Sequence, residues 1–426
     1  MKKIAILGAA ESGVGAAILA QQKGMEVFVS DMGTIKPRYK AMLDEHHIEW
    51  EEGRHSEQRL LQADEVVKSP GIPDTAPLIV KLKAQHTPII SEIELAGRYT
   101  DAKMVCITGS NGKTTTTSLI YHIFRLAGMD VGLAGNIGHS LALQVAEQPH
   151  RWYVIELSSF QLDNMYQFRA DIAVLMNITP DHLDRYDFKF ENYARSKMRI
   201  LQNLRPDDSF IYWQDDPVTA RLLPEYATPA RVVAFSEHQP FPIAGAELAL
   251  PGRHNLYNQM AAAYACMAAG IPATVIAEGL KSFPGVEHRL ERVAEVDGVL
   301  WVNDSKATNV DACRWALEAM TRPTVLILGG LDKGNDYNDI RQLVVEKCCA
   351  LVMLGADNSK LLDFFTPLGL PIRDTHSMAD CVAACRELAR PGQTVLLSPC
   401  CASFDLFKNM EDRGEQFKSL VRARQL

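Results

Sequence analysis

Several features are absent from the sequence. It has no CxxC motif, no zinc-finger spacing of cysteine and histidine, and no internal repeat or low-complexity tract. Its nine cysteines are an odd number, and two pairs, Cys348–Cys349 and Cys400–Cys401, are adjacent, which rarely allows an unstrained bridge. Cys381 and Cys385 are four positions apart, which predicts one helix face. We therefore expect nine reduced thiols and a cytoplasmic location, because disulfides persist mainly in oxidising compartments.

Long apolar runs are also missing. No stretch of about 18 apolar residues runs without a glycine or proline break, so no membrane insertion is expected. Met1-Lys2-Lys3 followed by an apolar run imitates a secretory leader, but the run is short and meets Glu11. We interpret it as a strand that leads into a glycine-rich turn.

Positive charge is not in excess. Lysine and arginine number 44 against 52 acidic residues, which gives a formal net charge of −8. This composition argues against a nucleic-acid partner, which requires a basic face. Phosphate groups would have to be bound by backbone N–H groups and a few placed cations.

What is present is an alternation of short apolar runs and helix-length segments, typical of βαβ units with parallel sheets. The predicted strands are Ile4–Leu7, Val27–Ser30, Met104–Thr108, Val154–Leu157, Ile172–Asn177, Val325–Leu328, Leu351–Leu354 and Val395–Ser398. A length of 426 residues suggests two to four domains. We predict three α/β segments: a Rossmann-like one over 1–92, a P-loop ATPase-like one with a mainly parallel sheet over 93–285, and a Rossmann-like one over 286–426.

The strongest motif is Gly109-Ser110-Asn111-Gly112-Lys113-Thr114-Thr115, between a predicted strand and a predicted helix. Backbone N–H groups in such a turn cradle phosphate oxygens, while the lysine reaches the β- and γ-phosphates and Thr114 meets Mg²⁺. The loop is shorter than the general P-loop, because Ile107 stands where that pattern has its first glycine. The motif indicates nucleotide binding.

Further polar residues follow other strands of the middle segment. Glu156 ends one strand, where a carboxylate beside a P-loop suits Mg²⁺, although such an acid is more often a cap. His182 follows the next strand in Asn177–Arg185 and fits a metal ligand, a proton shuttle or a plain loop residue. Lys197, taken alone, resembles a solvated helical lysine.

The outer segments carry polar strand ends of their own. Gly8, Gly13 and Gly15 follow the first strand and Asp31 ends the second, but the spacing is not the GxGxxG of dinucleotide-binding proteins. Ser69-Pro70-Gly71-Ile72 forms another such turn. Three strand-end loops of the last segment suit an anionic, carboxylate-bearing substrate, namely residues 303–309, 329–333 and 398–405.

Taken together, these motifs resemble the Mur ligase family over nearly the whole chain. Gly109–Thr115 marks the wider family, which includes folylpolyglutamate synthetases. Three further stretches resemble the D-glutamate-adding branch: Leu157–Leu162, Asp304–Asn309, and Ser398-Pro399 with Ala402-Ser403 and Phe407–Asn409. Asp304-Ser305-Lys306 stands where diaminopimelate- or lysine-adding relatives carry an Asp-Asn-Pro-type motif, which argues against them.

The resemblance implies a role for each matching position. Those expected to contact ATP are Gly109, Ser110, Asn111, Gly112, Lys113, Thr114, Thr115, Asn255, Asn258, Arg289 and Asp304. Those expected to contact the UDP-linked substrate are Ser12, Asp31, Ser69, Asn136 and His182, and those expected to clamp D-glutamate are Lys306, Thr308, Lys333 and Ser403. Two Mg²⁺ ions would be bound through Thr114, Glu156, His182 and a carbamoylated Lys197, and the catalytic residues would be Lys113, Lys197 and His182.

The activity implied is ATP-dependent ligation of D-glutamate to UDP-N-acetylmuramoyl-L-alanine through an acyl phosphate, by a monomer that must close to assemble its site. Another Mur-type or folylpolyglutamate-type amino-acid ligase is the nearest alternative. A P-loop ATPase acting as a switch or motor, a nicotinamide-dependent dehydrogenase and a non-catalytic scaffold are rivals from other classes. The first would need no amino-acid clamp, the second lacks its GxGxxG motif, and the third would leave three sets of polar loops unused.

Overall fold

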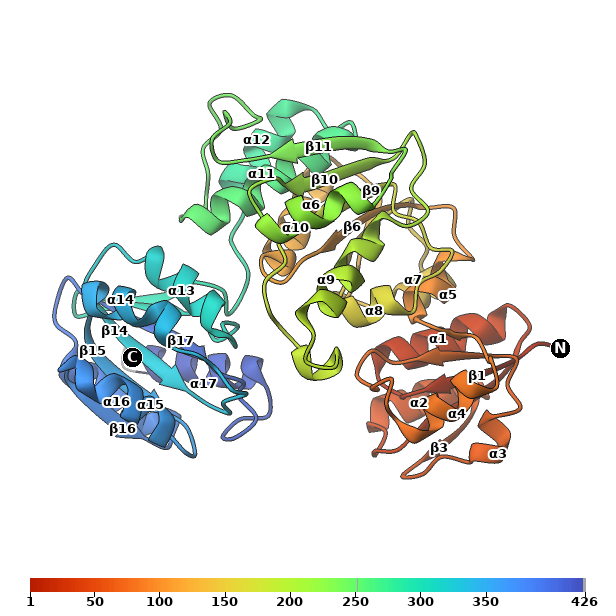
Figure 1. Ribbon diagram of the computed structural model, residues 1–426, viewed down its shortest axis with the longest axis horizontal. Coiled ribbons are helices and arrows are strands. Elements are labelled where there is room, and N and C mark those ends of the chain that lie inside the picture. Colours follow the sequence, from red (N-terminus) through yellow and green to blue (C-terminus); the bar gives the residue numbers. More distant parts are fainter. Residues whose placement is uncertain (251, 424–426) are drawn as a thin grey trace. The chain divides into compact units, whose positions relative to one another are not determined.

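The computed structural model describes residues 1–250 and 252–423. They form three open β-sheets with helices between the strands (Figure 1). By its internal contacts the chain divides into two compact units, Met1–Leu248 with Tyr257–Phe283 and Ala249–Leu256 with Pro284–Leu426. The first unit contains two of the sheets and the second unit contains the third. Within the described part of the chain, every helix is too short or too polar to cross a bilayer.

The first sheet has five parallel strands in the order β3-β2-β1-β4-β5. Its elements are β1 (Lys3–Leu7), α1 (Glu11–Gln22), β2 (Glu26–Asp31), α2 (Pro37–Glu45), β3 (Glu49–Glu52), α3 (Glu57–Leu60), β4 (Glu65–Lys68), α4 (Pro77–Ala84), β5 (Ile89–Ile90) and α5 (Glu92–Gly97). The strand order reverses between β1 and β4, which are paired with Leu7 opposite Lys68. Ligands bind at such a switch point, beyond the carboxyl ends of the strands.

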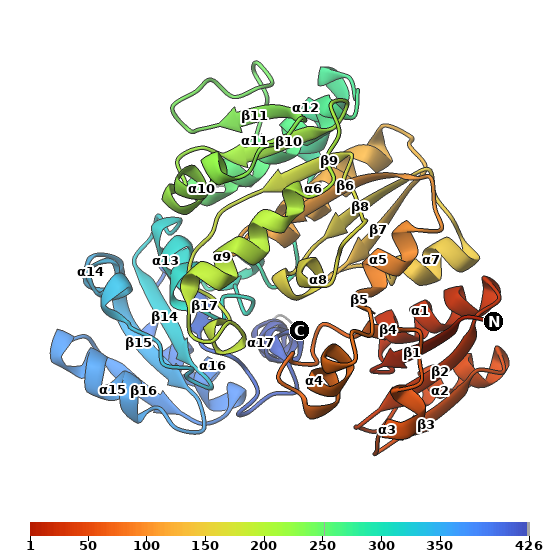
Figure 2. The ribbon, with the colours of Figure 1, turned by 45° about the vertical axis from the view of Figure 1, so that its right-hand side comes forward.

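The second sheet has six parallel strands in the order β11-β10-β9-β6-β8-β7 (Figure 2). Its elements are β6 (Lys103–Thr108), α6 (Lys113–Leu126), β7 (Val131–Gly135), α7 (Leu141–Glu147), β8 (Trp152–Glu156), α8 (Ser159–Asp163), β9 (Ile172–Leu175), η1 (Leu183–Arg185), α9 (Phe190–Met198), η2 (Arg199–Leu201), β10 (Ser209–Trp213), α10 (Pro217–Leu222), η3 (Leu223–Glu225), β11 (Arg231–Phe235), α11 (Arg253–Ala268) and α12 (Ala273–Ser282). Ile107 lies opposite Glu156 and Thr108 opposite Leu175, so β6, β8 and β9 end at one edge.

The third sheet has the order β12-β13-β17-β14-β15-β16 and is parallel except for β12, which runs antiparallel to β13. Its elements are β12 (Glu291–Val296), β13 (Val299–Asn303), α13 (Val310–Glu318), β14 (Thr324–Gly329), α14 (Asn338–Lys347), β15 (Cys348–Leu354), α15 (Ser359–Phe365), η4 (Thr366–Leu368), β16 (Ile372–Thr375), α16 (Met378–Leu388), β17 (Thr394–Cys400) and α17 (Met410–Arg422). All six residues of β14 are buried, as expected of a central strand covered by helices on both faces.

One hydrophobic core joins the first two sheets. It runs from Ile4 and Ile6 of β1 to Ala173 and Leu175 of β9. Helix α1 packs against α5 and α7, and Gly15 permits this approach because a Cβ there would lie 2.1 Å from the Ser140 Oγ. The two sheets therefore form one compact unit.

The predicted α/β fold with three domains is confirmed, and each predicted strand lies on an observed one. The runs 154–157 and 172–177 extend past the observed strands, which end at Glu156 and Leu175. All nine cysteines are unpaired, and Cys381 and Cys385 are both buried on α16. The bounds 1–92, 93–285 and 286–426 stay predictions.

Candidate active site

The predicted phosphate-binding loop, residues 109–112, connects β6 to α6. Gly109 has φ +147° and Gly112 has φ +84°, both in the region that favours glycine. A Cβ on Gly109 would lie 2.8 Å from the Met176 Cβ, and one on Gly112 would lie 2.3 Å from the Asn258 Oδ1. The loop therefore needs glycine at both positions, and α6 starts at Lys113 with its first N–H groups at the mouth of the loop.

The strand-end segment 177–179 holds this loop in place. Ser110 N donates to the Asn177 carbonyl at 2.8 Å, and Asn111 N donates to the Asn177 Oδ1 at 2.9 Å. The Ser110 hydroxyl donates to the Thr179 carbonyl at 2.8 Å. Lys113 Nζ donates to the Gly109 and Ser110 carbonyls at 2.8 and 2.9 Å, so its ammonium lies over the loop.

A buried carboxylate lies at the end of β8, on the strand next to β6. Glu156 is 1% exposed, and its Oε1 accepts a 2.7 Å hydrogen bond from the Asn136 side chain. Its Oε2 is buried and has no hydrogen-bond partner among the described residues. An unpaired carboxylate oxygen is costly to bury, and a hard cation would satisfy it.

Lys197 is buried, unlike the solvated helical lysine that its local sequence suggests. It is 2% exposed, and its Nζ lies 3.4 Å from the Thr108 Oγ1 at the end of β6. Burial and the positive charge of Lys113 hold the pKa of Lys197 well below its usual value, against the opposing effect of nearby acids, including Asp181 and Glu156. The amine is therefore predisposed to be neutral, which is its nucleophilic form.

His182 has a left-handed backbone conformation with φ 51°. Its side chain is 47% exposed, and its Nε2 lies 3.6 Å from the Asp181 Oδ2. Its ring meets the Phe160 ring edge-on, with the centroids 5.1 Å apart. The histidine side chain is thus exposed on a loop that aromatic packing supports.

Polar residues also gather at the switch point of the first sheet. The Ser69 Oγ is buried without a hydrogen-bond partner among the described residues, and a Cβ on Gly8 would lie 2.4 Å from it. Both carboxylate oxygens of Asp31 accept backbone N–H groups, from Ala9 and Gly33, at 2.7 Å. Asp31 therefore shapes the glycine-rich turn, and Ser12 lies in the first turn of α1 that follows it.

In the second unit, a buried acid and an arginine meet at the end of β13. Asp304 is 1% exposed and lies 3.7 Å from the Arg289 guanidinium. Its carboxylate also accepts the Ser398 hydroxyl at 3.1 Å and Leu290 N at 3.2 Å. Burial raises the pKa of Asp304 to about 6, although Arg289 and these hydrogen bonds lower it.

The residues predicted to bind an amino acid follow strands of the third sheet. Lys306 and Thr308 lie between β13 and α13, where Lys306 N donates to the His288 carbonyl at 3.1 Å. Lys333 is exposed in the loop after β14, and Ser403 is buried after β17. Leu331 N donates to the Ala402 carbonyl at 2.8 Å, so these last two loops are neighbours.

Asn255 and Asn258 lie one turn apart on α11 and are both buried. The Asn258 Oδ1 lies 3.4 Å from the Thr116 Oγ1 on α6, so Asn258 borders the phosphate-binding loop. Asn255 belongs to the segment Ala249–Leu256 of the second unit.

Sequence reasoning missed three residues that shape the site. Asn177 and Thr179 anchor the loop, and the Tyr193 hydroxyl lies 2.9 Å from the Ser110 Oγ. Each lies within a stretch singled out around His182 or Lys197, but its partner is 66 or more residues away in the sequence. Such pairings carry no local signal.

Three protein-family models match successive segments of the chain. The description "MurD N-terminal domain" matches residues 3–77, "Mur ligase middle domain" matches 107–243, and "Mur ligase, glutamate ligase domain" matches 288–401.

Two curated relatives are similar over almost their whole length. A UDP-N-acetylmuramoylalanine–D-glutamate ligase of Bacteroides fragilis is 61% identical, with 99% of this chain and all of the relative covered. An enzyme of the same name from Porphyromonas gingivalis is 55% identical, with 98% of each chain covered.

Solved structures show the same fold. The UDP-N-acetylmuramate–alanine ligase MurC of Thermotoga maritima superimposes with a TM-score of 0.62 at 18% identity, covering both chains fully. The MurF ligase of the same organism, in complex with ADP, superimposes with a TM-score of 0.61 at 16% identity, and the match covers 93% of this chain and 95% of that one.

Three α/β domains with a phosphate-binding loop in the middle one are the architecture of the Mur ligases. The chain belongs to this family, and within it to the UDP-N-acetylmuramoylalanine–D-glutamate ligases, as its sequence identity of 61% over 99% of its length shows.

Proposed function

We propose that this protein joins D-glutamate to UDP-N-acetylmuramoyl-L-alanine at the expense of ATP, forming ADP and phosphate in peptidoglycan precursor synthesis. The observation that carries the proposal is the group of Lys113, Glu156 and Lys197 at one edge of the second sheet. It combines the predicted phosphate-binding loop with a buried amine and a buried carboxylate oxygen that has no hydrogen-bond partner among the described residues.

ATP would bind with its phosphates on Gly109–Thr115, in the direction of the α6 N-terminus. Asn258 borders this loop through Thr116, which supports its assignment to the ATP site. Asn255, Arg289 and Asp304 are assigned to ATP by the match to the family.

The residues around Glu156 fit Mg²⁺. Its Oε2 is a buried oxygen without a partner among the described residues, and hard cations prefer oxygen ligands. Thr114 would hold a first ion, and Glu156, His182 and Lys197 a second. When bound, these ions would neutralise charge on the transferring phosphoryl group.

Lys197 would serve as a ligand only after its charge changes. A neutral amine attacks CO₂, forming a carbamate and releasing a proton, so that a cation becomes an oxygen donor. The lowered pKa of Lys197 favours the neutral amine that this step requires.

In the reaction, the alanyl carboxylate of the UDP-linked substrate attacks the γ-phosphate of ATP, which yields an acyl phosphate and ADP. Lys113 stabilises the negative charge that develops on the phosphoryl oxygens. The amine of D-glutamate then attacks the acyl carbon, phosphate leaves, and a peptide bond remains. His182 is assigned to the metal and the intermediate, since its ring is exposed beside Asp181.

Each domain is assigned one group of ligands: 1–92 the UDP-linked substrate, 93–285 ATP, and 286–426 the amino acid. The Ser69 Oγ at the switch point of the first sheet has no hydrogen-bond partner among the described residues, which supports Ser69 and its neighbours Ser12 and Asp31 as contacts to the nucleotide. Asn136, which is held to Glu156, would contact the sugar part of that substrate. Lys306, Thr308, Lys333 and Ser403 would bind the carboxylates of D-glutamate, in a monomeric enzyme.

The test is phosphate release from ATP and Mg²⁺ with UDP-N-acetylmuramoyl-L-alanine, comparing D-glutamate, L-glutamate, meso-diaminopimelate and no amino acid. We expect release only with D-glutamate, and a product heavier by one glutamyl residue. Release with another amino acid would refute the specificity. Release without any would refute ligation and favour a plain ATPase.

A further inference from the structure

Arg185, in the short helix η1 that follows β9 of the second sheet, donates hydrogen bonds to a loop that follows β4 of the first sheet. The Arg185 guanidinium donates to three consecutive backbone carbonyls, at 3.2 Å to Pro70, 3.3 Å to Gly71 and 3.1 Å to Ile72. These residues directly follow Ser69, whose buried hydroxyl lies at the switch point of the first sheet. Because a guanidinium is planar with five N–H donors, it can span several carbonyls as no other side chain can.

On its own side, Arg185 is tied to the loop that presents His182. It ends η1 (Leu183–Arg185), and His182 directly precedes that helical turn. Its guanidinium lies 4.3 Å from the centroid of the Phe160 ring, and this same ring meets the His182 ring edge-on. One phenyl ring therefore fixes both the arginine and the histidine.

Lys68 holds the same loop from the first sheet. It is buried at the end of β4, where its Nζ donates to the Ile72 carbonyl at 2.9 Å and to the Asp74 carboxylate at 2.7 Å. Burial lowers the pKa of Lys68, and the nearby Arg185 lowers it further, against the opposing effect of Asp74. The Ile72 carbonyl thus accepts hydrogen bonds from cations of both sheets.

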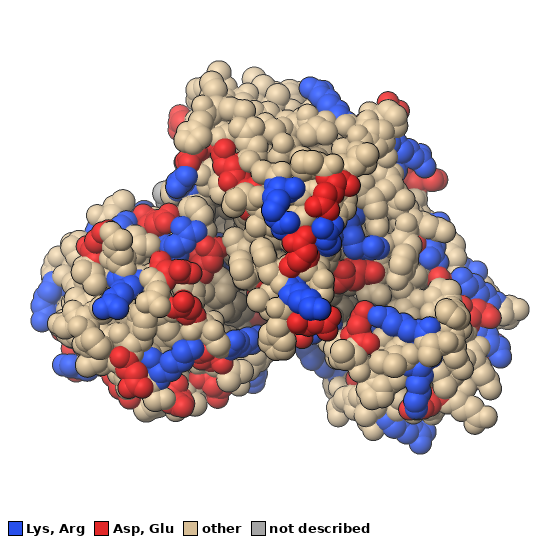
Figure 3. Space-filling model, viewed as in Figure 1, with Lys and Arg blue, Asp and Glu red and all other residues tan. Residues whose placement is uncertain are grey.

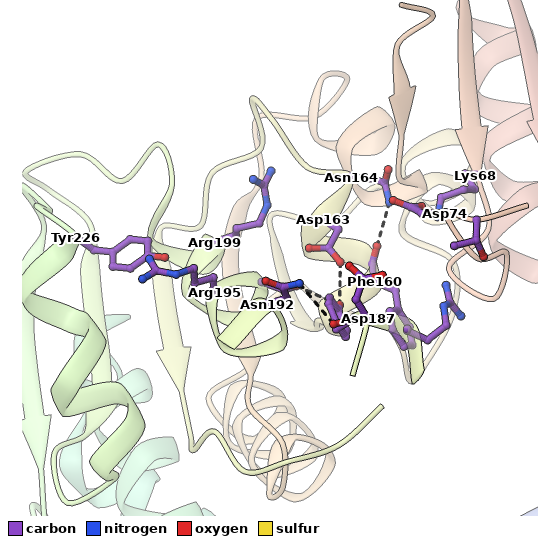
Figure 4. A pocket seen from close by; sticks show the side chains of 14 residues that line it. Lys68, Asp74, Phe160, Asp163, Asn164, Asp187, Asn192, Arg195, Arg199 and Tyr226 are labelled. Carbon is purple, nitrogen blue, oxygen red and sulfur yellow. Dashed lines mark hydrogen bonds and ion pairs between the residues drawn. The ribbon is translucent and has the colours of Figure 1, made fainter. Parts of the chain in front are cut away.

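The hydrogen bonds between Arg185 and residues 70–72 lie beside a cavity of about 620 Å³. Its lining includes Lys68, Asp74, Phe160, Asp163 and Arg185 (Figure 4). The cations on this wall are already bound by protein acceptors: Lys68 by Asp74, and Arg185 by the loop carbonyls. The wall therefore serves the contact between the two sheets better than it would serve an anionic ligand.

We propose that Arg185 is a positioning residue of the ligation reaction. By fixing residues 70–72 against the His182 loop, it sets where the nucleotide-sugar substrate bound near Ser69 presents its carboxylate to the phosphate-binding loop. This rests on the proposed function, since it takes Ser69 and its neighbours as contacts to that substrate.

Steady-state kinetics of Arg185→Ala and Arg185→Lys test the proposal, with Arg231→Ala as the matched control on the exposed side of β11. For Arg185→Ala we expect KM for the UDP-linked substrate to rise about tenfold, the scale of one charge-assisted hydrogen bond, and kcat to fall. KM for ATP and for D-glutamate should change by less than about twofold. The KM of Arg185→Lys for the UDP-linked substrate should lie between that of the wild type and that of Arg185→Ala, because a lysine retains the charge but reaches fewer carbonyls.

Hydrogen–deuterium exchange of the ligand-free enzyme separates this proposal from the proposed function. Faster exchange in residues 66–76 of Arg185→Ala, but not of Arg231→Ala, is expected and does not depend on which substrate is used. Unchanged exchange in residues 66–76 would show that Arg185 does not hold residues 70–72 in place. An unchanged KM for the UDP-linked substrate, or an equal rise of all three KM values, would overturn the positioning role, whereas inactivity of the wild type with D-glutamate would refute the proposed function alone.

Discussion

At the scale of single residues, the candidate site keeps ionisable groups in surroundings that oppose their charged forms. Lys197 has its pKa lowered by burial and by Lys113, and Asp304 has its pKa raised by burial. Such groups destabilise the fold that contains them, and active sites retain them because the chemistry requires them. Replacing Lys197 or Asp304 with an uncharged residue should therefore stabilise the fold while it lowers ligase activity.

Lys197→Met is the clearest case. Methionine has a similar volume and no charge, so we expect the free energy of unfolding at pH 7 to rise by about 1 kcal/mol, while ligase activity is lost. Since the pKa is lower in the folded chain, the unfolded chain binds more protons, and wild-type stability rises with pH up to the ordinary value near 10.5. The gain measured by denaturant unfolding in CO₂-free buffer should therefore be smaller at pH 9.5 than at pH 7, and a gain independent of pH would contradict this.

Asp304→Asn gives the opposite dependence on pH. The pKa of about 6 exceeds the ordinary value near 3.8, so the folded protein binds more protons between these values and loses stability as pH rises through them. The variant lacks this loss. Relative to wild type, its midpoint of thermal unfolding should rise from pH 4 to pH 6 and level off above that, as scanning calorimetry would show. A constant difference across this range would mean that Arg289 already compensates the charge.

Glu156→Gln tests the carboxylate assigned to Mg²⁺. The amide keeps the hydrogen bond with Asn136 but loses the charge, so the fold should persist while phosphate release falls by about 100-fold or more. Raising the Mg²⁺ concentration should recover part of the activity. Wild-type activity in this variant would remove Glu156 from the metal site.

The sequence indicated these residue-scale features unevenly. Lys113 is predicted by its own motif, because a glycine-rich turn ending in Lys-Thr-Thr after a strand indicates phosphate binding. Glu156 alone favours a cap, and its assignment to Mg²⁺ comes from the family resemblance. The composition around Lys197 suggests a solvated lysine, because its observed burial places it beside Thr108 of β6, which is 89 residues away in the sequence. Arg185 had no signal at all, since its partners are backbone carbonyls 113–115 residues away.

At the scale of elements, the loop from β6 to α6 depends on its two glycines. Gly109→Ala would place a Cβ 2.8 Å from the Met176 Cβ and 3.1 Å from Asn177 N, at φ +147°. We expect it to destabilise the protein by about 2–3 kcal/mol and to abolish nucleotide binding.

Gly128→Ala is the matched control for that substitution. Gly128 also has positive φ, at +70°, but no atom of the described residues lies within 4 Å of its Cβ position. It should cost only about 1 kcal/mol and leave ATP binding intact in calorimetric titration. Equal effects of the two substitutions would mean that backbone strain alone, without crowding, governs the loop.

Among the elements, the buried parallel strands were predictable and the sheet edge was not. β14 and β17 are buried along their whole length and contain the apolar runs Val325–Leu328 and Val395–Leu397, as expected of central strands in a parallel sheet. β12 (Glu291–Val296) reads Glu-Arg-Val-Ala-Glu-Val and has one buried residue, so it lacks the longer apolar run that identified the eight predicted strands. Its antiparallel pairing with β13 follows from a tight turn at Asp297-Gly298 in which both residues have positive φ.

At the scale of the whole molecule, charge gives no single binding face. Figure 3 shows acidic and basic side chains interspersed over the face in view, as the net charge of −8 suggests. The polar residues that we assign to the substrates lie instead on strand-end loops of three separate sheets. A reaction that uses all three must bring its substrates to within bonding distance, so we expect ligand binding to favour one arrangement of the domains.

Ligand-dependent compaction is the last prediction, and small-angle scattering measures it. ATP analogue and Mg²⁺ with the UDP-linked substrate should together lower the radius of gyration, because each ligand contributes contacts from a different domain and their joint binding favours the state that has all of them. Either ligand alone should do less. Arg185→Ala, which loosens only the loop of the first sheet, should need more UDP-linked substrate for the same change but no more nucleotide. A radius of gyration that stays constant under saturating ligands would show that the domains are already placed for reaction, and the kinetic effect of Arg185→Ala would then have to arise within the bound complex.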